Sequence, residues 1–315
     1  MVLWVISFSD RLDQKITEKQ SHVVVGLDPR WHLIPEYLKQ EATKQFGQGP
    51  EAIKEVLFQF GLGIMEAVAE YAVAIKPQFA FFEQFGPWGM LALQELVLEA
   101  GKLGLLVIGD GKRNDIGSTA EAYANAYLGK VDIFEQKTQV WSMDALTVNA
   151  YLGVDGVRPF INVAKEHGNG LFVLLRTSNP SASDFQDLTC AKGKAYEAVA
   201  AKVAEWVVGE EMGQCGYSFI GVVVGATYPD DAKRLRELLP HCIFLVPGYG
   251  AQGAGALEVL PCFDENGKGA VVNSARDIIF AYTKPAYAEY GERNFADAAR
   301  QAAKTMRDDL LRVVG

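Results

Sequence analysis

Short apolar segments recur along the chain, and each is nearly continuous in Val, Ile and Leu instead of alternating with polar residues. This pattern is typical of strands that are buried on both faces, as in a parallel sheet. Stretches with the apolar spacing of a helix separate them, for example residues 50–71 and 195–212. The predicted strands are residues 22–28, 72–77, 105–111, 145–151, 171–177, 219–227, 243–250 and 270–276.

Eight strands that alternate with helices predict an α/β fold of the (β/α)8 TIM-barrel class. A doubly wound open sheet is the structural alternative. The first predicted strand, however, is not followed by the GxGxxG pattern of dinucleotide-binding sheets. The sequence contains no linker rich in Pro, Gly or Ser and no low-complexity tract. We therefore expect a single domain over residues 1–315.

Charged residues stand where two of these strands end. The segment GDGKRNDIGSTA directly follows the third apolar run and contains Asp110, Lys112 and Asp115, while Lys76 ends the second strand. Residues two apart on a strand point the same way, and TIM-barrel active sites form at the carboxyl ends of the strands. The pattern predicts an alternating Lys–Asp–Lys–Asp array in the barrel mouth. A solvated loop with surface ion pairs, each worth about 0–1 kcal/mol, is the alternative.

Such an array suits a reaction in which negative charge develops on the substrate. Two unit charges 4 Å apart interact by about 1 kcal/mol in bulk water and by about 4 kcal/mol at an effective dielectric constant of 20. A fixed ammonium group therefore stabilises a carbanion strongly once water is excluded. A neighbouring carboxylate keeps that ammonium group protonated and oriented.

Composition excludes several other roles. Thirty basic residues against 39 acidic ones give a formal net charge of −9, and no Lys/Arg-rich run is present, so we expect no nucleic-acid partner. No apolar stretch reaches the roughly 18 residues of a membrane span, and we expect a cytoplasmic protein without a membrane partner. The four cysteines form no CxxC pair, which predicts reduced, buried thiols. The four histidines lack metal-ligand spacing, and we expect neither a metal nor a cofactor.

The charged segment resembles the signature of the orotidine 5′-monophosphate decarboxylase family, D-x-K-x-x-D-I followed by a threonine. The blocks FSDRL, VGLDPR, IKPQFAFFE, SNP and PGYGAQG resemble, in the same order, those of the long-form bacterial branch. The resemblance extends from about Phe8 to Arg276. Asn114 stands where glycine is expected, which changes the backbone preference of the loop but no charge. The matching residues are Asp110, Lys112, Asp115, Ile116 and Thr119.

The resemblance implies that the chain converts orotidine 5′-phosphate to UMP in de novo pyrimidine biosynthesis. Lys112 would stabilise the C6 carbanion left by loss of CO₂ and then protonate it. Asp110 would lie beside the substrate carboxylate and hold Lys112, and Lys76 would connect Asp110 to the ribose hydroxyls. Asp28 would accept hydrogen bonds from the ribose. Asp115 would reach into the partner subunit's site, so the resemblance also implies a homodimer.

Further residues are expected to bind other parts of the nucleotide. Thr119 is expected at the substrate by the same resemblance, and Ser178 resembles a serine that hydrogen-bonds the pyrimidine. A serine before Asn-Pro is also ordinary turn chemistry. Gln252 and Arg276 follow the seventh and eighth strands, where such barrels bind phosphate, although a glycine-rich segment by itself is equally typical of a turn. Residues 179–187 are expected to close over the substrate.

Two other classes of function remain open at this level. A barrel decarboxylase or aldolase acting on a sugar phosphate could share the motif. Mg²⁺-dependent relatives would need an acidic residue in place of Lys76, and a Schiff-base aldolase would need an uncharged Lys76 or Lys112. A non-catalytic phosphate-binding barrel is the second class, and it would tolerate Lys112→Ala.

Overall fold

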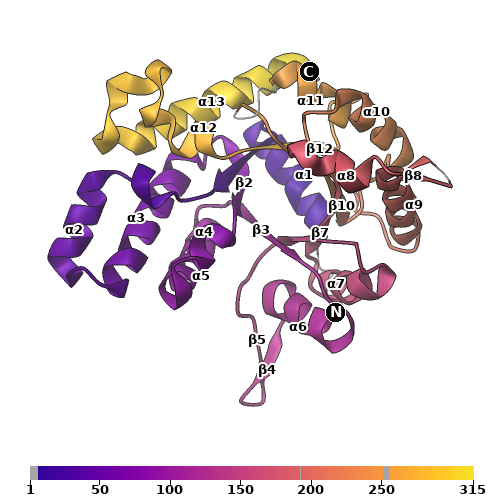
Figure 1. Ribbon diagram of the computed structural model, residues 1–315, viewed down its shortest axis with the longest axis horizontal. Coiled ribbons are helices and arrows are strands. Elements are labelled where there is room, and N and C mark those ends of the chain that lie inside the picture. The colour runs from indigo at the N-terminus through magenta and orange to yellow at the C-terminus, as the bar shows by residue number, and fades with distance from the viewer. Residues whose placement is uncertain (1–5, 192, 251–254) are drawn as a thin grey trace.

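The computed structural model describes residues 6–191, 193–250 and 255–315. Eight parallel strands form a closed barrel in the order β1-β12-β11-β10-β7-β6-β3-β2 (Figure 1). Pairing of Val23 with Val272 joins the first strand to the last and closes the sheet, which excludes the open doubly wound alternative. The predicted (β/α)8 barrel is therefore confirmed. Its strands are β1 (Val23–Leu27), β2 (Ala72–Pro77), β3 (Leu106–Arg113), β6 (Ala145–Val148), β7 (Gly170–Arg176), β10 (Ile220–Val224), β11 (Phe244–Pro247) and β12 (Ala270–Ser274).

All eight predicted strands are present, but several predictions extend past the observed carboxyl ends. β11 ends at Pro247, because Gly248 and Gly250 adopt positive φ angles of 105° and 75° that no regular strand contains. After β6, the Asn149 side chain accepts a hydrogen bond from the backbone N–H of Tyr151 and forms a turn. β6 and β11 therefore end where the residues that follow them turn the backbone away from a strand.

Helices surround the barrel, and three of them begin with proline at or next to their first residue, where no backbone N–H is needed. The carboxyl-terminal helix packs on α3: the rings of Phe60 and Phe295 lie 5.3 Å apart, and Gly63 leaves room for Phe295. The helices are α1 (Phe8–Lys19), α2 (Glu36–Phe46), α3 (Pro50–Val68), α4 (Ala80–Glu83), α5 (Gly86–Lys102), α6 (Gly117–Leu128), α7 (Val154–His167), α8 (Ser183–Gln186), α9 (Ala195–Val208), α10 (Pro229–Leu238), α11 (Ala256–Val259), α12 (Arg276–Ile279) and α13 (Phe295–Val314).

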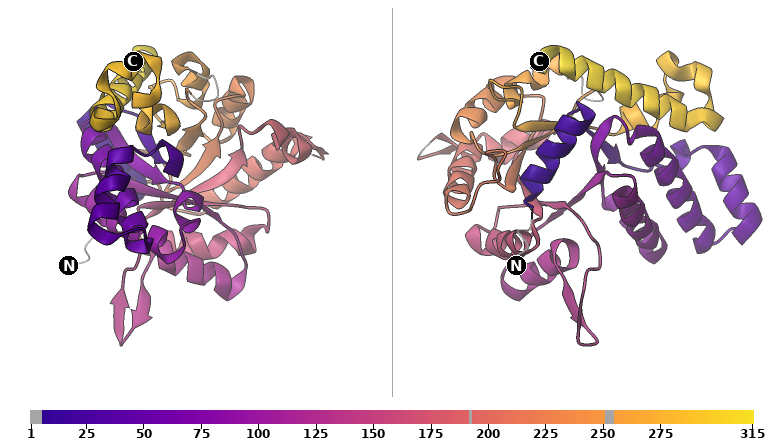
Figure 2. Two further views of the ribbon diagram at one scale, coloured as in Figure 1. Left: turned by 60° about the vertical axis from the view of Figure 1, so that its left-hand side comes forward. Right: turned by 180° about the vertical axis from the view of Figure 1, so that it is seen from behind.

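Helix α1 closes the amino-terminal end of the barrel (Figure 2). Its Phe8 packs edge-to-face on Phe172 of β7. Its Arg11 pairs with Asp144, directly before β6. At its other end, Lys19 donates to the backbone carbonyls of Ala72 and Gly104 at 2.8 and 3.2 Å. The barrel interior is thus closed at the amino-terminal ends of the strands, so a ligand has to enter at their carboxyl ends.

Two small hairpins interrupt the barrel pattern. The first, β4 (Val131–Ile133) with β5 (Gln136–Thr138), projects away from the body in all the views, and Phe134 at its tip is 96% exposed. The second, β8 (Thr189–Cys190) with β9 (Gly193–Lys194), precedes α9. Its Cys190 is exposed, and Cys215, in the loop before β10, is half-buried, so the prediction of buried thiols is wrong for these two cysteines. All four thiols are unpaired, and Cys242 and Cys262 are buried.

Within residues 6–191, 193–250 and 255–315, no helix combines the length and the apolar character that a membrane span requires.

Candidate active site

Three of the predicted charged residues meet at the carboxyl ends of β2 and β3. These strands are neighbours in the barrel, with Ala74 opposite Leu106. The ammonium group of Lys76 donates to one carboxylate oxygen of Asp110, and Lys112 Nζ donates to the other at 2.5 Å. One carboxylate therefore lies between two ammonium groups.

Asp110 is the best-connected side chain of this cluster. Gln78 Nε2 donates to Oδ2 at 3.1 Å, and Thr147 Oγ1 donates to Oδ1 at 3.0 Å. With the two lysines, these donors place four hydrogen bonds on a carboxylate that is only 6% exposed. A buried carboxylate with that many donors is held in one orientation and stays ionised.

Opposing electrostatic effects keep the buried groups charged. Burial by itself would raise the pKa of Asp110, but the charges of Lys76 and Lys112 outweigh it and hold the pKa well below its usual range. Burial would likewise lower the pKa of Lys76, yet the nearby Asp110 and Asp28 carboxylates raise it above the ordinary value. Lys76 is consequently an ammonium group at neutral pH, which is the wrong state for a Schiff-base nucleophile.

Asp28 follows β1 and contrasts with Asp110. Its Oδ1 atom is buried and accepts no hydrogen bond from any residue that the structure describes. Burial raises the pKa of Asp28, and the positive charge of Lys76 offsets part of that increase. An unsatisfied buried carboxylate oxygen is costly unless a ligand supplies donors. Asp28 is therefore suited to accept hydrogen bonds from ligand hydroxyls.

The backbone at Lys112 departs from regular strand geometry. The pairing of β3 with β6 shifts register between Gly109 and Arg113, and Lys112 itself has φ 44°, in the left-handed region. That conformation costs a non-glycine residue of the order of 1–3 kcal/mol and persists only where its surroundings impose it. The lysine side chain is 43% exposed, so its ammonium group lies at the mouth of the barrel.

Asp115 and Thr119 do not join the cluster within this chain. Asp115 Oδ1 accepts a hydrogen bond from the backbone N–H of Ile116 at 2.8 Å, and Thr119 is exposed in the first turn of α6. Among the residues that the structure describes, no hydrogen bond or ion pair links Asp115 to Lys76 or Lys112. The predicted four-charge array is thus a three-charge array in the single chain.

The residues predicted to hold the pyrimidine and the phosphate lie at the ends of later strands. Ser178 follows β7 and packs closely on Gly225 after β10, where a Cβ would lie 2.9 Å from the serine nitrogen. Arg276 is exposed at the start of α12, directly after β12. Gly250 lies against Asp277, leaving no space for a side chain. Gln252 lies outside the described residues.

The segment after Ser178, predicted to close over the substrate, is attached to the barrel through Arg176. Asp187 pairs with this buried guanidinium group at 3.3 Å, and Gln186 Oε1 accepts the backbone N–H of Thr177 at 3.0 Å. The guanidinium group also lies 3.9 Å from the ring centroid of Tyr228. The end of the segment is therefore anchored, and its closing motion stays a prediction.

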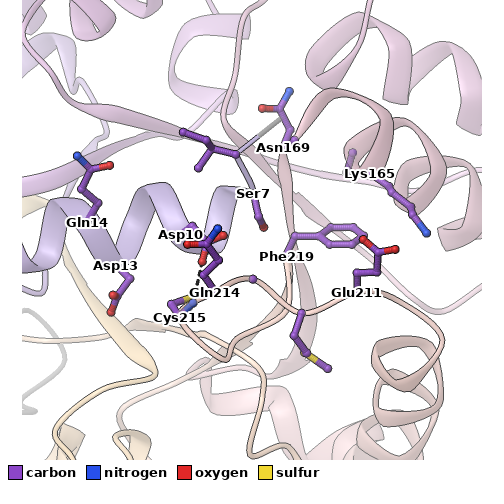
Figure 3. Close-up of a pocket in the computed structure, with 15 residues that line it drawn as sticks. Ser7, Asp10, Asp13, Gln14, Lys165, Asn169, Glu211, Gln214, Cys215 and Phe219 are labelled. Carbon is purple, nitrogen blue, oxygen red and sulfur yellow. Dashed lines mark hydrogen bonds between the residues drawn. The ribbon is translucent and has the colours of Figure 1, made fainter. Parts of the chain in front are cut away.

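A cavity of about 650 Å³ opens at the other end of the barrel. Figure 3 shows Asp10 of α1 beside Gln214 and Cys215 of the loop before β10, and Asp13 and Gln14 of the same helix also line the cavity. Asp10 Oδ1 there accepts the backbone N–H of Cys215 at 2.8 Å, which is an ordinary loop-fixing contact. This cavity contains none of the predicted site residues. In the part of the chain that the structure describes, no three His, Cys, Asp or Glu side chains gather as metal ligands would.

Sequence comparison places the chain among proteins of one family. Residues 21–289 match the profile of the "Orotidine 5'-phosphate decarboxylase / HUMPS family". The orotidine 5′-phosphate decarboxylase of Caldicellulosiruptor saccharolyticus is 43% identical over 310 residues, 97% of this chain and 98% of that one. The enzyme of the same name from Rhodopirellula baltica is 43% identical over 307 residues, 97% of this chain and 99% of that one.

The chain belongs to the orotidine 5′-phosphate decarboxylase / HUMPS family. A solved structure of Leishmania donovani OMP decarboxylase agrees with it at a TM-score of 0.74 and 29% identity, covering 98% of this chain and 99% of that one. The resemblance found in the sequence, and with it the prediction of a carboxy-lyase of this family, is confirmed.

Two contacts of this decarboxylase-family site were not predicted from the sequence. Gln78 follows Lys76 by two residues, so strand periodicity alone could have placed it on the same face. Thr147 is the only hydroxyl in the apolar run ALTV, and an isolated polar residue in a buried strand is a signal for a partner. Neither signal identifies Asp110 as the partner, because that contact crosses between strands.

Proposed function

We propose that this chain decarboxylates orotidine 5′-phosphate to UMP. The observation that carries the proposal is the buried Asp110 carboxylate held between Lys76 and Lys112 at the carboxyl end of the barrel. Family membership supports the same reaction, since the named relatives are orotidine 5′-phosphate decarboxylases. The product belongs to pyrimidine biosynthesis.

The chemical step uses the fixed charges of the cluster. The bond between C6 of the pyrimidine and its carboxylate breaks, CO₂ leaves, and the electron pair remains on C6. The Lys112 ammonium group stabilises this carbanion, transfers a proton from Nζ to C6, and regains a proton from solvent. Asp110 accepts a hydrogen bond from Lys112 Nζ at 2.5 Å and so orients the ammonium group before the proton transfer. The donors are in place before the reaction begins, so little reorganisation is required as charge develops.

The remaining site residues are assigned to substrate binding. Asp28, whose Oδ1 atom lacks a partner among the described residues, accepts hydrogen bonds from the ribose hydroxyls, and Lys76 links the ribose to Asp110. Ser178 hydrogen-bonds the pyrimidine. Gln252 and Arg276 hold the phosphate, and binding there contributes energy for orienting the reacting carbon.

We also propose a homodimer in which Asp115 completes the partner subunit's site, and we assign Thr119 to substrate binding. The exposed apolar side chains around Asp115 support this arrangement, because monomeric proteins rarely leave such residues grouped together. Gly156 of α7 lies beside the Asp115 backbone, which puts the loops after β3 and β6 side by side. The exposed large apolar residues here are Ile116 (55%), Tyr151 (85%), Leu152 (46%) and Val154 (43%) at the start of α7.

The test is turnover of orotidine 5′-phosphate by the purified chain in EDTA, followed by the decrease in ultraviolet absorbance. Lys112→Ala is expected to lower kcat by at least about 10³-fold, since both proton transfer and carbanion stabilisation are lost. Lys137→Ala, a change of an exposed lysine in the β5 hairpin strand, is the matched control and should keep full activity.

Other outcomes separate the alternatives. Full activity of Lys112→Ala contradicts the proposal. Loss of wild-type activity in EDTA indicates a Mg²⁺-dependent relative, and borohydride trapping of a keto-sugar phosphate indicates a Schiff-base aldolase. Phosphate-ligand binding without any turnover indicates a non-catalytic barrel.

A further inference from the structure

Thr147 of β6 contacts both Asp110 and Lys112 of the charged motif. The residue is 1% exposed, and its hydroxyl oxygen accepts the backbone N–H of Lys112 at 2.9 Å. The same hydroxyl group donates to Asp110 Oδ1 at 3.0 Å, whereas the alternative acceptor, the Gly109 carbonyl, lies farther away at 3.5 Å. One buried hydroxyl therefore contacts both the carboxylate and the backbone of the lysine.

The strand pairing explains why this contact is needed. Gly109 pairs with Leu146 and Arg113 pairs with Val148, so four steps along β3 match only two steps along β6. The extra residues bulge out of the ladder and include Lys112, which has φ 44°. In a regular ladder a backbone carbonyl would accept the Lys112 N–H; here the Thr147 hydroxyl takes that place.

The packing below the bulge is apolar, and the Thr147 hydroxyl is the group that accepts the Lys112 N–H, while the Asp110 carbonyl accepts the Phe79 N–H at 3.3 Å. A Cβ at Gly111 would lie 2.6 Å from the Phe79 ring, and one at Gly109 would lie 2.4 Å from the Met143 sulfur. These apolar contacts limit how close the backbone comes to its neighbours, but they impose no direction on the Lys112 N–H. Direction comes from hydrogen bonding, which requires alignment of donor and acceptor.

We infer that Thr147 is a positioning residue for the decarboxylation: its hydroxyl holds the Asp110 carboxylate and the Lys112 backbone in the arrangement that directs the Lys112 ammonium group at C6. This inference rests on the proposed function. Lys112 is 43% exposed, and Asp110 is the acidic partner in its ion pair. The direction of its side chain therefore depends on the two groups that Thr147 holds.

Removing the hydroxyl should affect the reaction more than the fold. Lys76, Gln78 and Lys112 still donate to Asp110 without Thr147, so the carboxylate stays ionised and the substrate pocket keeps its charge. The lost contact leaves Lys112 less well directed, and misplacement of a reacting group by about 1 Å costs on the order of 10²-fold in rate. The expected loss is therefore in kcat.

The experiment compares Thr147→Val, which keeps the shape, with Thr147→Ser, which keeps the hydroxyl. The valine variant should lose roughly 10–100-fold in kcat, with KM for orotidine 5′-phosphate and Kd for UMP close to the wild-type values, and the serine variant should recover most of the loss. Thr147→Ala applies the same test if the valine variant does not fold. Ser218→Ala removes an equally buried hydroxyl before β10, at the other end of the barrel, and should leave kcat unchanged.

Each result is decisive. Wild-type kcat in Thr147→Val overturns the positioning role. A matched loss of kcat and UMP affinity without rescue by serine also overturns it, because it indicates a purely structural residue. An inactive wild-type enzyme that still binds UMP rejects the proposed function itself, and the role of Thr147 in that reaction with it.

Discussion

Both ends of the barrel carry ion pairs, but they differ in whether their carboxylate oxygens have hydrogen-bond partners. At the amino-terminal end, Asp144 accepts hydrogen bonds from Arg11 and from the backbone N–H of Val107, while Arg11 also donates to Gly168 and Asn169. At the carboxyl-terminal end, Asp28 has a buried oxygen without a partner among the described residues.

Asn273 adds to the same contrast. Its Oδ1 atom, at the carboxyl-terminal end of β12, is a further buried atom without a partner in the described part of the chain. Unsatisfied or strained groups persist where they serve ligand binding. One end is therefore arranged for stability and the other for chemistry, as the strand directions of a TIM barrel require.

The largest effect is expected for Asp110→Asn, which breaks the central ion pair. We expect a loss of activity of roughly 10³-fold or more, because Lys112 is no longer held in its orientation. The free energy of unfolding should fall by about 3 kcal/mol, because the buried Lys76 loses its ion-pair partner. Kinetics and urea unfolding measure the two effects, with the exposed Asp132→Asn as the control.

The pH dependence of the same variant has a defined sign. The pKa of folded Asp110 is lowered, so its contribution to stability is fully present above the unfolded-state value of about 3.9 and is lost as the pH falls through the folded value. The variant should lack this acid-dependent loss. An unchanged acid-unfolding curve would contradict the assignment of Asp110 as a stabilising carboxylate.

Arg11→Leu tests the opposite end and should separate stability from catalysis. We expect the free energy of unfolding to fall by about 2 kcal/mol, because Asp144 loses its charged partner while both side chains are largely shielded. The kcat of the folded enzyme should not change. Arg312→Leu, at a side chain that is 75% exposed, is the control. A large decrease in kcat at full folding would mean that the two ends are not independent.

The smallest effect is expected for Asp28→Asn, and its sign on stability is the reverse. The pKa of Asp28 is raised in the folded state, so its charge destabilises the protein above the folded pKa and has no such effect below the unfolded value of about 3.9. The variant should be more stable by about 1 kcal/mol near pH 7, and this advantage should vanish near pH 4. Its kcat/KM should fall, because the ribose acceptor is weakened.

Denaturation at the two pH values and kinetics at neutral pH measure this trade-off. A variant that is less stable at pH 7 would show that Asp28 already has a stabilising role without substrate. Asp132→Asn again serves as the reference for removal of an exposed charge.

The amino-acid pattern was enough to predict the strand count, the barrel class and the positions of Lys76, Asp110 and Lys112 at strand ends. Both faces of each strand are buried, so the apolar runs are continuous, and charges can follow them only where the runs stop. Family membership was also readable, because the charged motif and the ordered blocks are local in the chain.

Which side chains contact one another depends on the folded arrangement of the strands. Asp110 is joined to Gln78 and Thr147 across neighbouring strands, and the register shift that bends Lys112 into its left-handed conformation depends on β6. Such contacts depend on strand order and register. Local periodicity predicts neither of them, because a parallel barrel pairs residues that are distant in sequence. Asp115 shows the same limit. Its motif can be read from the local sequence, but the groups that its carboxylate contacts cannot.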